Sequence, residues 1–236
     1  MDAFEWKSLF SSMMKSPVLC VIALVAGSLL LAGCQSKSKP ANQAESPSTG
    51  FEDLVQTFEN SDRDDWQDPD RVIDQLGTLT GKTVADIGAG TGYFTFRILP
   101  KAQKVIAVEI DDRFIQFLDR KAEQLPDSLQ PRLETRLAEP QDPHLQDGEV
   151  DVVLVVNTYI YMQDRINYFR NLKLAIKPGG HIVVVDFKKK PMKVGPPQDL
   201  RLAPHDIQAE LLSAGYTNIR VDNTTLEYQY MIRADL

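Results

Sequence analysis

The 236-residue sequence contains only two cysteines, Cys20 and Cys34, and both precede residue 50. The rest of the chain therefore cannot form a disulfide, supply a cysteine nucleophile or hold a cysteine-bound cluster. Histidine is also scarce, since there are three in the whole chain, and their wide separation gives no metal-ligand spacing. We therefore expect no metal site.

Positive charge is also in short supply, because 26 Lys and Arg residues stand against 33 Asp and Glu residues and the net charge is −7. Proteins that bind nucleic acids usually present a basic surface to the phosphates. We therefore expect no nucleic-acid partner. The length suits one globular domain with an additional segment attached.

The additional segment lies at the N-terminus, where residues 18–32 form an almost unbroken apolar run. Fifteen residues are too few for a comfortable membrane span and suit the core of a signal peptide. The run ends in Leu31-Ala32-Gly33-Cys34, which resembles the lipobox of bacterial lipoproteins. The resemblance implies that residues 1–33 are a signal peptide and that Cys34 is lipidated; an uncleaved signal anchor is the alternative.

The residues on either side of this apolar run lead to further predictions. Residues 1–6 are acidic and aromatic rather than basic, so we expect translation to begin at Met13 or Met14. Residues 34–50 comprise the lipidated cysteine and a Ser-, Pro- and Gln-containing tether that we expect to be disordered. The domain at 51–236 would then be anchored to the cell envelope on the periplasmic or extracytoplasmic face, and Gln35 is compatible with the outer membrane.

An apolar strand predicted at 84–87 is followed by three glycines at alternate positions, Gly88, Gly90 and Gly92, and by a helix predicted at 93–99. Glycines allow the backbone to approach a ligand closely, and a helix start offers unpaired N–H groups. A strand, a glycine turn and a helix in this order predict a site for a nucleotide-like ligand.

The glycine spacing separates two classes of nucleotide site. A dinucleotide fingerprint requires glycine or alanine where this chain has Tyr93, and the third glycine comes one residue early. Asp86 stands two residues before the first glycine, and the pattern D-x-G-x-G-x-G resembles motif I of the class I S-adenosylmethionine-dependent methyltransferases. The resemblance implies that the cofactor S-adenosyl-L-methionine contacts Asp86, Gly88, Ala89, Gly90 and Gly92.

The remaining pattern alternates strands with helices, which predicts an α/β fold. The predicted helices are 51–60, 69–76, 112–124, 163–176 and 204–214, and the further strands are 104–109, 132–137, 150–156, 181–187, 216–221 and 226–232. A closing strand pair is typical of the class I methyltransferases. The resemblance therefore implies a Rossmann-like seven-stranded sheet with an antiparallel last strand and helices on both faces.

Two acids follow the second and third predicted strands. Glu109 lies 21 residues after Gly88, where an acid in a doubly wound fold accepts hydrogen bonds from ribose hydroxyls. The resemblance implies the same contact here. It also implies that Glu139 meets the adenine amine, with Asp142 as a rival for that role.

The strand at 150–156 is the clearest in the chain and is followed by Asn157, Tyr159 and Tyr161. Because strand carboxyl ends form the ligand crevice of an open α/β sheet, we expect these three side chains to face the methyl donor or its acceptor. Similar methyltransferases carry Asn-x-Tyr-His-His here, whereas this chain has Ile160 and Tyr161 in place of the histidines. We therefore assign no catalytic residue and expect no single essential general base.

Three further segments carry weaker signals. The sequence from Arg63 to Pro69, with Trp66 and Gln67, resembles one branch of these enzymes, in which N-terminal helices cover the cofactor; Trp66 either does so or packs beneath a helix start. Residues 228–230, Tyr-Gln-Tyr, resemble the same branch. The basic residues 188–193 form either a contact for an anionic substrate or phospholipid, or a solvated loop.

Taken together, these features predict methyl transfer from S-adenosylmethionine to a small-molecule acceptor. The alternatives are a non-catalytic S-adenosylmethionine-binding module and a nucleotide-binding oxidoreductase. Tyr93 and the closing strand pair disfavour the oxidoreductase. The oligomeric state is not predictable from these residues.

Overall fold

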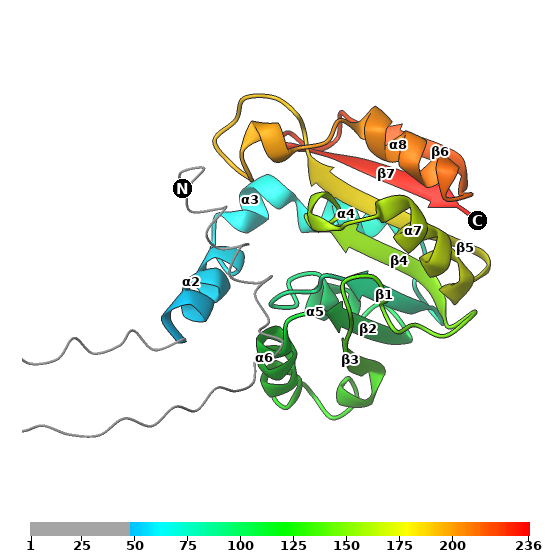
Figure 1. The fold of residues 1–236 in the computed structure, drawn as a ribbon. Coiled ribbons are helices and arrows are strands. Elements are labelled where there is room, and N and C mark those ends of the chain that lie inside the picture. The colour runs from blue at the N-terminus through cyan, green and yellow to red at the C-terminus, as the bar shows by residue number, and fades with distance from the viewer. Residues whose placement is uncertain (1–47) are drawn as a thin grey trace, which may run out of the picture. The chain divides into compact units, whose positions relative to one another are not determined.

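The computed structural model describes residues 48–236, so the predicted signal peptide at 1–33, Cys34 and nearly all of the tether lie outside the described residues. Its strands are Thr83–Ile87 (β1), Lys104–Glu109 (β2), Leu133–Leu137 (β3), Val150–Val156 (β4), Ile176–Phe187 (β5), Thr217–Asp222 (β6) and Gln229–Asp235 (β7). They form one sheet in the order β3-β2-β1-β4-β5-β7-β6 (Figure 1). The strands β1 to β5 pair in parallel, and β7 lies antiparallel between β5 and β6. The predicted fold class is confirmed.

The predicted helices are present with shifted ends, and the structure adds one helix that was not predicted, Arg63–Gln67 (α3). They are Ser48–Phe58 (α2), Arg63–Gln67 (α3), Pro69–Gln75 (α4), Thr95–Ile98 (α5), Asp112–Ala122 (α6), Arg165–Ala175 (α7) and Pro204–Ser213 (α8), with short 3-10 turns at Gln130–Arg132 (η1), Tyr159–Tyr161 (η2) and Gln198–Leu200 (η3). Residues Val55–Leu236 form one compact unit, and the fold below is that of this unit. No helix of the described part of the chain is long and apolar enough to cross a membrane.

Two predicted boundaries are wrong for physical reasons. The helix expected from residue 93 begins at Thr95, because the glycine turn continues through Phe94. Residues 177–180, between the predicted helix at 163–176 and the predicted strand at 181–187, belong to β5. A side chain at Gly180 would collide with the backbone of Asp151, so this glycine lets β5 approach β4 where their register shifts.

Two helices begin after an aspartate, a residue type favoured at the N-cap. Asp111 caps α6, since its side chain accepts the Arg113 N–H at 2.9 Å. Asp68 precedes Pro69 at the first position of α4, but its side chain makes no cap hydrogen bond. Asp68 has a left-handed backbone with φ of 45°, so it ends α3 and begins α4 at a sharp bend.

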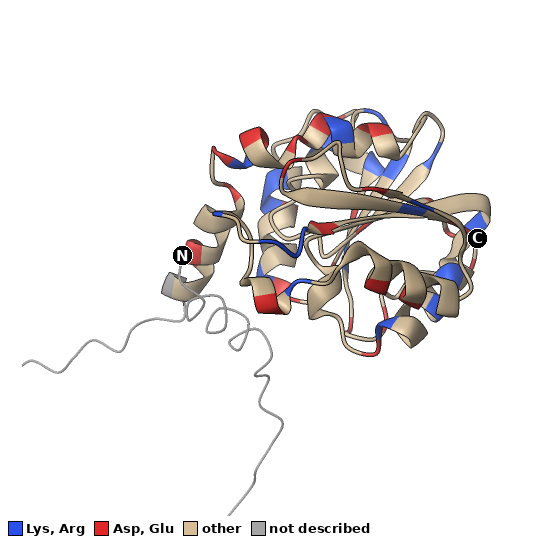
Figure 2. Cartoon of the chain, turned by 90° about the horizontal axis from the view of Figure 1, so that it is seen from above, with Lys and Arg blue, Asp and Glu red and all other residues tan. Residues whose placement is uncertain are grey.

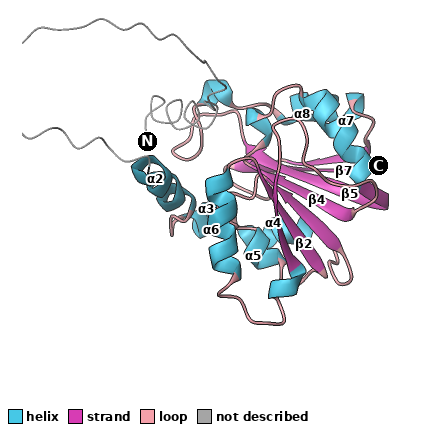
Figure 3. Ribbon diagram, turned by 60° about the horizontal axis from the view of Figure 1, so that its bottom comes forward, coloured by secondary structure: helices cyan, strands magenta, loops and turns pink. Residues whose placement is uncertain are grey.

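Both faces of the sheet are covered, as expected for parallel strands rich in branched apolar residues. Figure 3 shows α7 and α8 on one face and α4, α5 and α6 on the other. The first layer packs Phe169 and Leu172 of α7 and Leu211 of α8 on the sheet. The second packs Val72 of α4 and Ile98 of α5. This double layer fixes the strand ends, so that loops at the carboxyl ends of β1, β2, β4 and β5 share one edge.

Two leucines of α7 test this packing with the same chemical change. Leu172 is 1% exposed and lies in the core, whereas Leu174 is 63% exposed. We expect Leu172→Ala to lower the free energy of unfolding by about 2–5 kcal/mol through lost burial and a cavity. Leu174→Ala should change it by less than about 0.5 kcal/mol. Urea unfolding of both variants measures the difference; equal effects would show that α7 does not pack as described.

Candidate active site

The glycine loop after β1 is shaped by close neighbours rather than by free N–H groups. A side chain at Gly88 (φ of +73°) would collide with Thr158, and one at Gly92 (φ of +82°) would collide with Phe96 and Leu118. The N–H groups of Gly88 and Ala89 donate to Val108 O, and that of Gly92 donates to Ala89 O. The loop therefore offers a tight backbone surface in which these three N–H groups are paired within the protein. The unpaired N–H groups expected of the helix start, from residue 93 onward, stay a prediction.

Asp86 lies at the end of β1, directly before this loop, and is buried. The Thr95 hydroxyl donates to its Oδ2 at 2.6 Å, which ties the strand end to the start of α5. Burial raises the pKa of Asp86 to about 6, although the Thr95 hydrogen bond and the charge of Arg63 oppose the rise. The structure thus places this predicted residue beneath the loop.

Glu109 is buried at the end of β2 and meets the glycine loop, and its contact with ribose hydroxyls stays a prediction. Its Oε2 accepts the Gly90 N–H at 3.0 Å, and its Oε1 accepts those of Ile110 at 2.7 Å and Asp111 at 3.3 Å. Burial raises the pKa of Glu109, and these N–H groups oppose the rise. A carboxylate has about four acceptor positions, so one remains for a ligand hydroxyl.

Glu139 and Asp142 lie in a single turn after β3. The N–H of each donates to the carbonyl of the other, at 2.9 and 3.1 Å. The Asp142 carboxylate accepts the His144 N–H at 2.7 Å, whereas Glu139 is exposed. The proposed adenine contact of Glu139 stays a prediction.

The three residues predicted after β4 separate in the structure. Tyr159 is fully buried, its ring stacks on Phe169 at 4.8 Å, and its hydroxyl donates to Glu210 at 2.7 Å. It therefore points into the α7–α8 layer, because η2 turns it away from the strand edge. Asn157 stays at the edge with a left-handed backbone, φ of 57°. Tyr161 is half-buried, and burial and the charge of Asp186 raise the pKa of its hydroxyl.

Asp186, near the end of β5, is a further candidate that the sequence analysis missed. It is fully buried; its Oδ1 accepts the Phe187 N–H at 2.7 Å, and its Oδ2 has no hydrogen-bond partner within the described chain. Burial raises its pKa to about 7. A single acid after three valines was the available signal, since Asp86 is likewise the next-to-last residue of its strand.

The loop after β5 is held by Arg201, which is buried. Its guanidinium donates to the carbonyls of Pro196 at 2.6 Å, Lys190 at 2.8 Å, Val194 at 3.1 Å and Lys188 at 3.3 Å. The basic residues 188–193 thus belong to a constrained loop, with exposed lysines at 189, 190 and 193. Figure 2 shows Lys and Arg interspersed with Asp and Glu along the ribbon.

Trp66 packs against Phe187 of β5, with ring centroids 5.5 Å apart. It is half-buried, and this contact attaches α3 to the carboxyl end of the sheet. The contact with Phe187 supports the interpretation that Trp66 has a packing role. A contact between Trp66 and the cofactor stays a prediction.

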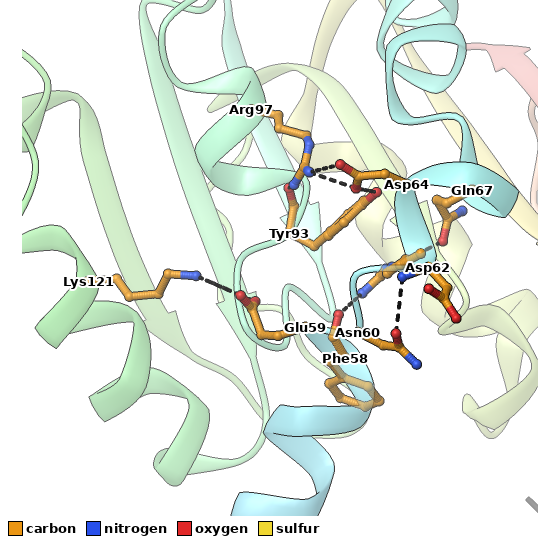
Figure 4. A network of polar contacts seen from close by, with 10 residues as sticks. Phe58, Glu59, Asn60, Asp62, Asp64, Gln67, Tyr93, Arg97 and Lys121 are labelled. Carbon is orange, nitrogen blue, oxygen red and sulfur yellow. Dashed lines mark hydrogen bonds and ion pairs between the residues drawn. The ribbon is translucent and has the colours of Figure 1, made fainter.

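The residues before β1 also lie along the glycine loop, where Figure 4 shows a polar network. Asp64 of α3 accepts a hydrogen bond from the Tyr93 hydroxyl and pairs with Arg97 at 2.8 Å. Glu59 pairs with Lys121 of α6 at 3.4 Å. A side chain at Gly90 would meet the ring of Phe58 at 3.4 Å. We call residues 58–67 the cover segment, because its contacts hold it against the loop.

Comparison with known proteins agrees with this geometry. Residues 85–182 match a family model described as "Methyltransferase domain". The chain is 24% identical over 173 residues to a phosphoethanolamine N-methyltransferase of Arabidopsis thaliana, covering 70% of this chain and 34% of that protein. It is 34% identical over 127 residues to a tRNA U34 carboxymethyltransferase of Hydrogenovibrio crunogenus, covering 51% and 36%. The chain thus spans about a third of the length of these curated relatives.

Solved structures show the same architecture. A methyltransferase from Aquifex aeolicus, described as SAM-dependent, has a TM-score of 0.70 at 23% identity, covering 76% of this chain and 95% of its own. The fold is that of the class I methyltransferases. A phosphoethanolamine N-methyltransferase of Haemonchus contortus in complex with S-adenosyl-L-methionine has a TM-score of 0.65 at 13% identity, covering 79% of this chain and 56% of that one. At these identities the structural likeness shows the fold alone.

The buried Asp186 predicts a pH dependence of stability. Its pKa rises from 3.8 to about 7 on folding, so the unfolded chain ionises it more readily. The folded chain prefers the protonated carboxyl, and this preference contributes fully to stability below about pH 4. As the pH rises to about 7 the contribution is lost, and the free energy of unfolding falls by up to about 4 kcal/mol. Asp186→Asn should remove this fall in the free energy of unfolding, measured with urea across that range.

The exposed Asp199 gives the matched control, and Asp199→Asn should leave the pH profile unchanged. Asp86 titrates in a similar range but is present in every variant, so the difference isolates Asp186. A difference between wild type and Asp186→Asn that stays constant with pH would contradict the raised pKa.

Proposed function

We propose that the protein is an S-adenosylmethionine-dependent methyltransferase that acts on a small-molecule acceptor. The observation that carries the proposal is the hydrogen bond from the Gly90 N–H to Glu109. It joins the glycine loop to the acid at the end of β2, where an acid receives ribose hydroxyls in doubly wound folds. The family match over residues 85–182 supports the same activity.

The residues at this edge fit such a cofactor. The glycine loop leaves no room for side chains at Gly88 and Gly92, because Thr158 lies against the first and Phe96 and Leu118 against the second, so glycine is needed for this tight path. Glu109 retains acceptor capacity for one hydroxyl, and Asp86 supplies a carboxylate next to the loop. S-adenosylmethionine supplies an activated methyl group on a sulfonium. The chain then needs mainly to hold the acceptor in line and to exclude water.

The acceptor is proposed to be small for an electrostatic reason. One relative acts, by its name, on phosphoethanolamine and another on tRNA. A net charge of −7 disfavours tRNA, which binds to basic surfaces. The acceptor side of the crevice would be formed by Asn157 and Tyr161, which are half-buried beyond the end of β4.

Ligand binding tests this function. We expect the wild-type chain to bind S-adenosylmethionine and S-adenosylhomocysteine, but not NAD, in titration calorimetry. Glu109→Ala should weaken binding by about 1–3 kcal/mol, because ligand hydroxyls lose their acceptor. Gly88→Val should abolish it through the collision with Thr158.

The exposed Glu123 at the end of α6 gives the control for charge, so Glu123→Ala should bind as the wild type does. Absence of heat with the wild type, or binding of NAD, would refute the proposed cofactor. Binding without methylation of any compound in a cell extract, followed with a labelled methyl group, would favour the binding-module alternative.

We also propose that the mature chain begins at Cys34 and is anchored by lipid on the outer side of the cytoplasmic membrane. The support is the apolar run at 18–32, the Leu-Ala-Gly-Cys ending and the absence of cysteine after residue 34. S-adenosylmethionine is made in the cytosol and is charged, so an exported enzyme would need cofactor supplied across the membrane. An uncleaved anchor with the domain in the cytosol is the alternative.

The two cysteines allow a matched test of the anchor. Fatty-acid labelling of the expressed chain should disappear in Cys34→Ser and persist in Cys20→Ser, because the proposed cleavage removes Cys20. Protease added to spheroplasts should digest the domain. Absent labelling together with a protected domain would refute the export proposal and support the cytosolic anchor.

A further inference from the structure

Three carboxamides that are far apart in the sequence form a closed hydrogen-bonded ring at the carboxyl edge of the sheet. Asn157 Nδ2 donates to Gln67 Oε1 at 3.2 Å, Gln67 Nε2 donates to Gln229 Oε1, and Gln229 Nε2 donates to Asn157 Oδ1. Gln67 ends α3, Asn157 follows β4 and Gln229 begins β7. The amide ring therefore joins the cover segment to two strands of the sheet.

Removing one amide from the ring is unfavourable. Gln67 and Gln229 are fully buried, and each amide donates one hydrogen bond and accepts one within the ring. Removing one member would leave a donor and an acceptor unpaired on its two neighbours, away from water. The ring therefore acts as one unit that holds Gln67 in place.

Gln67 in turn holds Arg63, one turn earlier in α3. Arg63 Nε donates to Gln67 Oε1 at 3.3 Å, and Arg63 Nη1 donates to Phe58 O at 3.0 Å. The guanidinium carbon lies 3.9 Å from the centroid of the Tyr93 ring, immediately after the glycine loop. Arg63 is thus fixed in direction, since two hydrogen bonds and one aromatic face define the plane of its guanidinium.

Arg63 differs from its neighbour Arg97 in having no carboxylate partner. Both guanidinium carbons lie 3.9 Å from the Tyr93 ring centroid, but Arg97 pairs with Asp64 at 2.8 Å. No described carboxylate lies within ion-pair distance of Arg63, and its Nη2 makes no hydrogen bond to a described residue. Burial lowers the pKa of Arg63 to about 10, so it is still cationic at neutral pH.

A half-buried guanidinium without an anion is unfavourable, and it marks a place for a ligand carboxylate. Asp86 and Glu59 are close enough to favour its charge but not to pair with it. We propose that Arg63 binds the carboxylate of the amino-acid part of S-adenosylmethionine and of its demethylated product, and that the amide ring positions Arg63 for this contact. The inference rests on the proposed function and adds a binding residue and three positioning residues.

Two ligands that differ by the carboxylate-bearing part separate this role from a general structural one. S-adenosylhomocysteine carries the amino-acid part, and 5′-methylthioadenosine lacks it. In titration calorimetry, Arg63→Met should weaken S-adenosylhomocysteine by about 10–100-fold, the loss expected for a charge-assisted hydrogen bond, and leave 5′-methylthioadenosine within about twofold. Gln229→Met should show the same selectivity with a loss of up to about tenfold.

Coupling and control variants complete the experiment. The double variant Arg63→Met/Gln229→Met should lose no more affinity for S-adenosylhomocysteine than Arg63→Met alone, because the ring acts through Arg63. The exposed Gln103, before β2 at the opposite edge of the sheet, gives Gln103→Met as the control, which should bind both ligands normally. Gln67→Met provides a second break of the ring if Gln229→Met does not fold, and retained 5′-methylthioadenosine binding reports a folded site in each variant.

The outcomes distinguish this inference from the proposed function. Wild-type binding of S-adenosylhomocysteine with unchanged affinity in Arg63→Met would overturn the role of Arg63 while leaving the cofactor in place. Equal losses for both ligands in Gln229→Met and Gln67→Met would show that the ring supports the whole site and does not act through Arg63. Failure of the wild type to bind either ligand would remove the proposed function itself.

Discussion

Buried carboxylates at the carboxyl ends of β1, β2 and β5 impose the main constraint on this edge of the sheet. A carboxylate away from water is unfavourable unless donors surround it. Asp86 is met by the Thr95 hydroxyl, and Glu109 by three backbone N–H groups. These contacts draw the glycine loop, the start of α5 and the loop after β2 into one arrangement, so the donors that satisfy the acids also shape the site.

The same edge carries its cations on the cover segment and the loop after β5. Arg97 forms an ion pair with Asp64, and Arg201 donates hydrogen bonds to four backbone carbonyls. Arg63 is different, because its contacts are an amide, a carbonyl and an aromatic face. Arg63 therefore places a positive charge without a carboxylate partner beside the glycine loop, where the N–H groups of Gly88, Ala89 and Gly92 already donate to backbone carbonyls.

Sequence reasoning succeeded where the determinant is local or periodic. The alternation of apolar strands with helices predicted the α/β fold, and the resemblance based on the glycine motif implied the seven-stranded sheet. The distance from Gly88 singled out Glu109, which the structure places beside the glycine loop. It failed to separate Tyr159 from Asn157 and Tyr161, because all three follow the same strand. The 3-10 turn η2 rotates Tyr159 into the α7–α8 layer, where Phe169 and Glu210 receive it. That choice depends on packing between helices and is not visible in strand periodicity.

The sequence by itself determined the order of the strands along the chain, the glycine loop and the acid that meets it, because these follow from short spacings and from alternation of apolar residues. Only the tertiary structure decided how Gln67, Asn157 and Gln229 meet. The sequence separation of Gln67 from Gln229 is 162 residues, and their contact depends on where β7 inserts beside β5. Hydrogen bonding between such residues is set by sheet register and burial, which are properties of the assembled fold and not of any single segment.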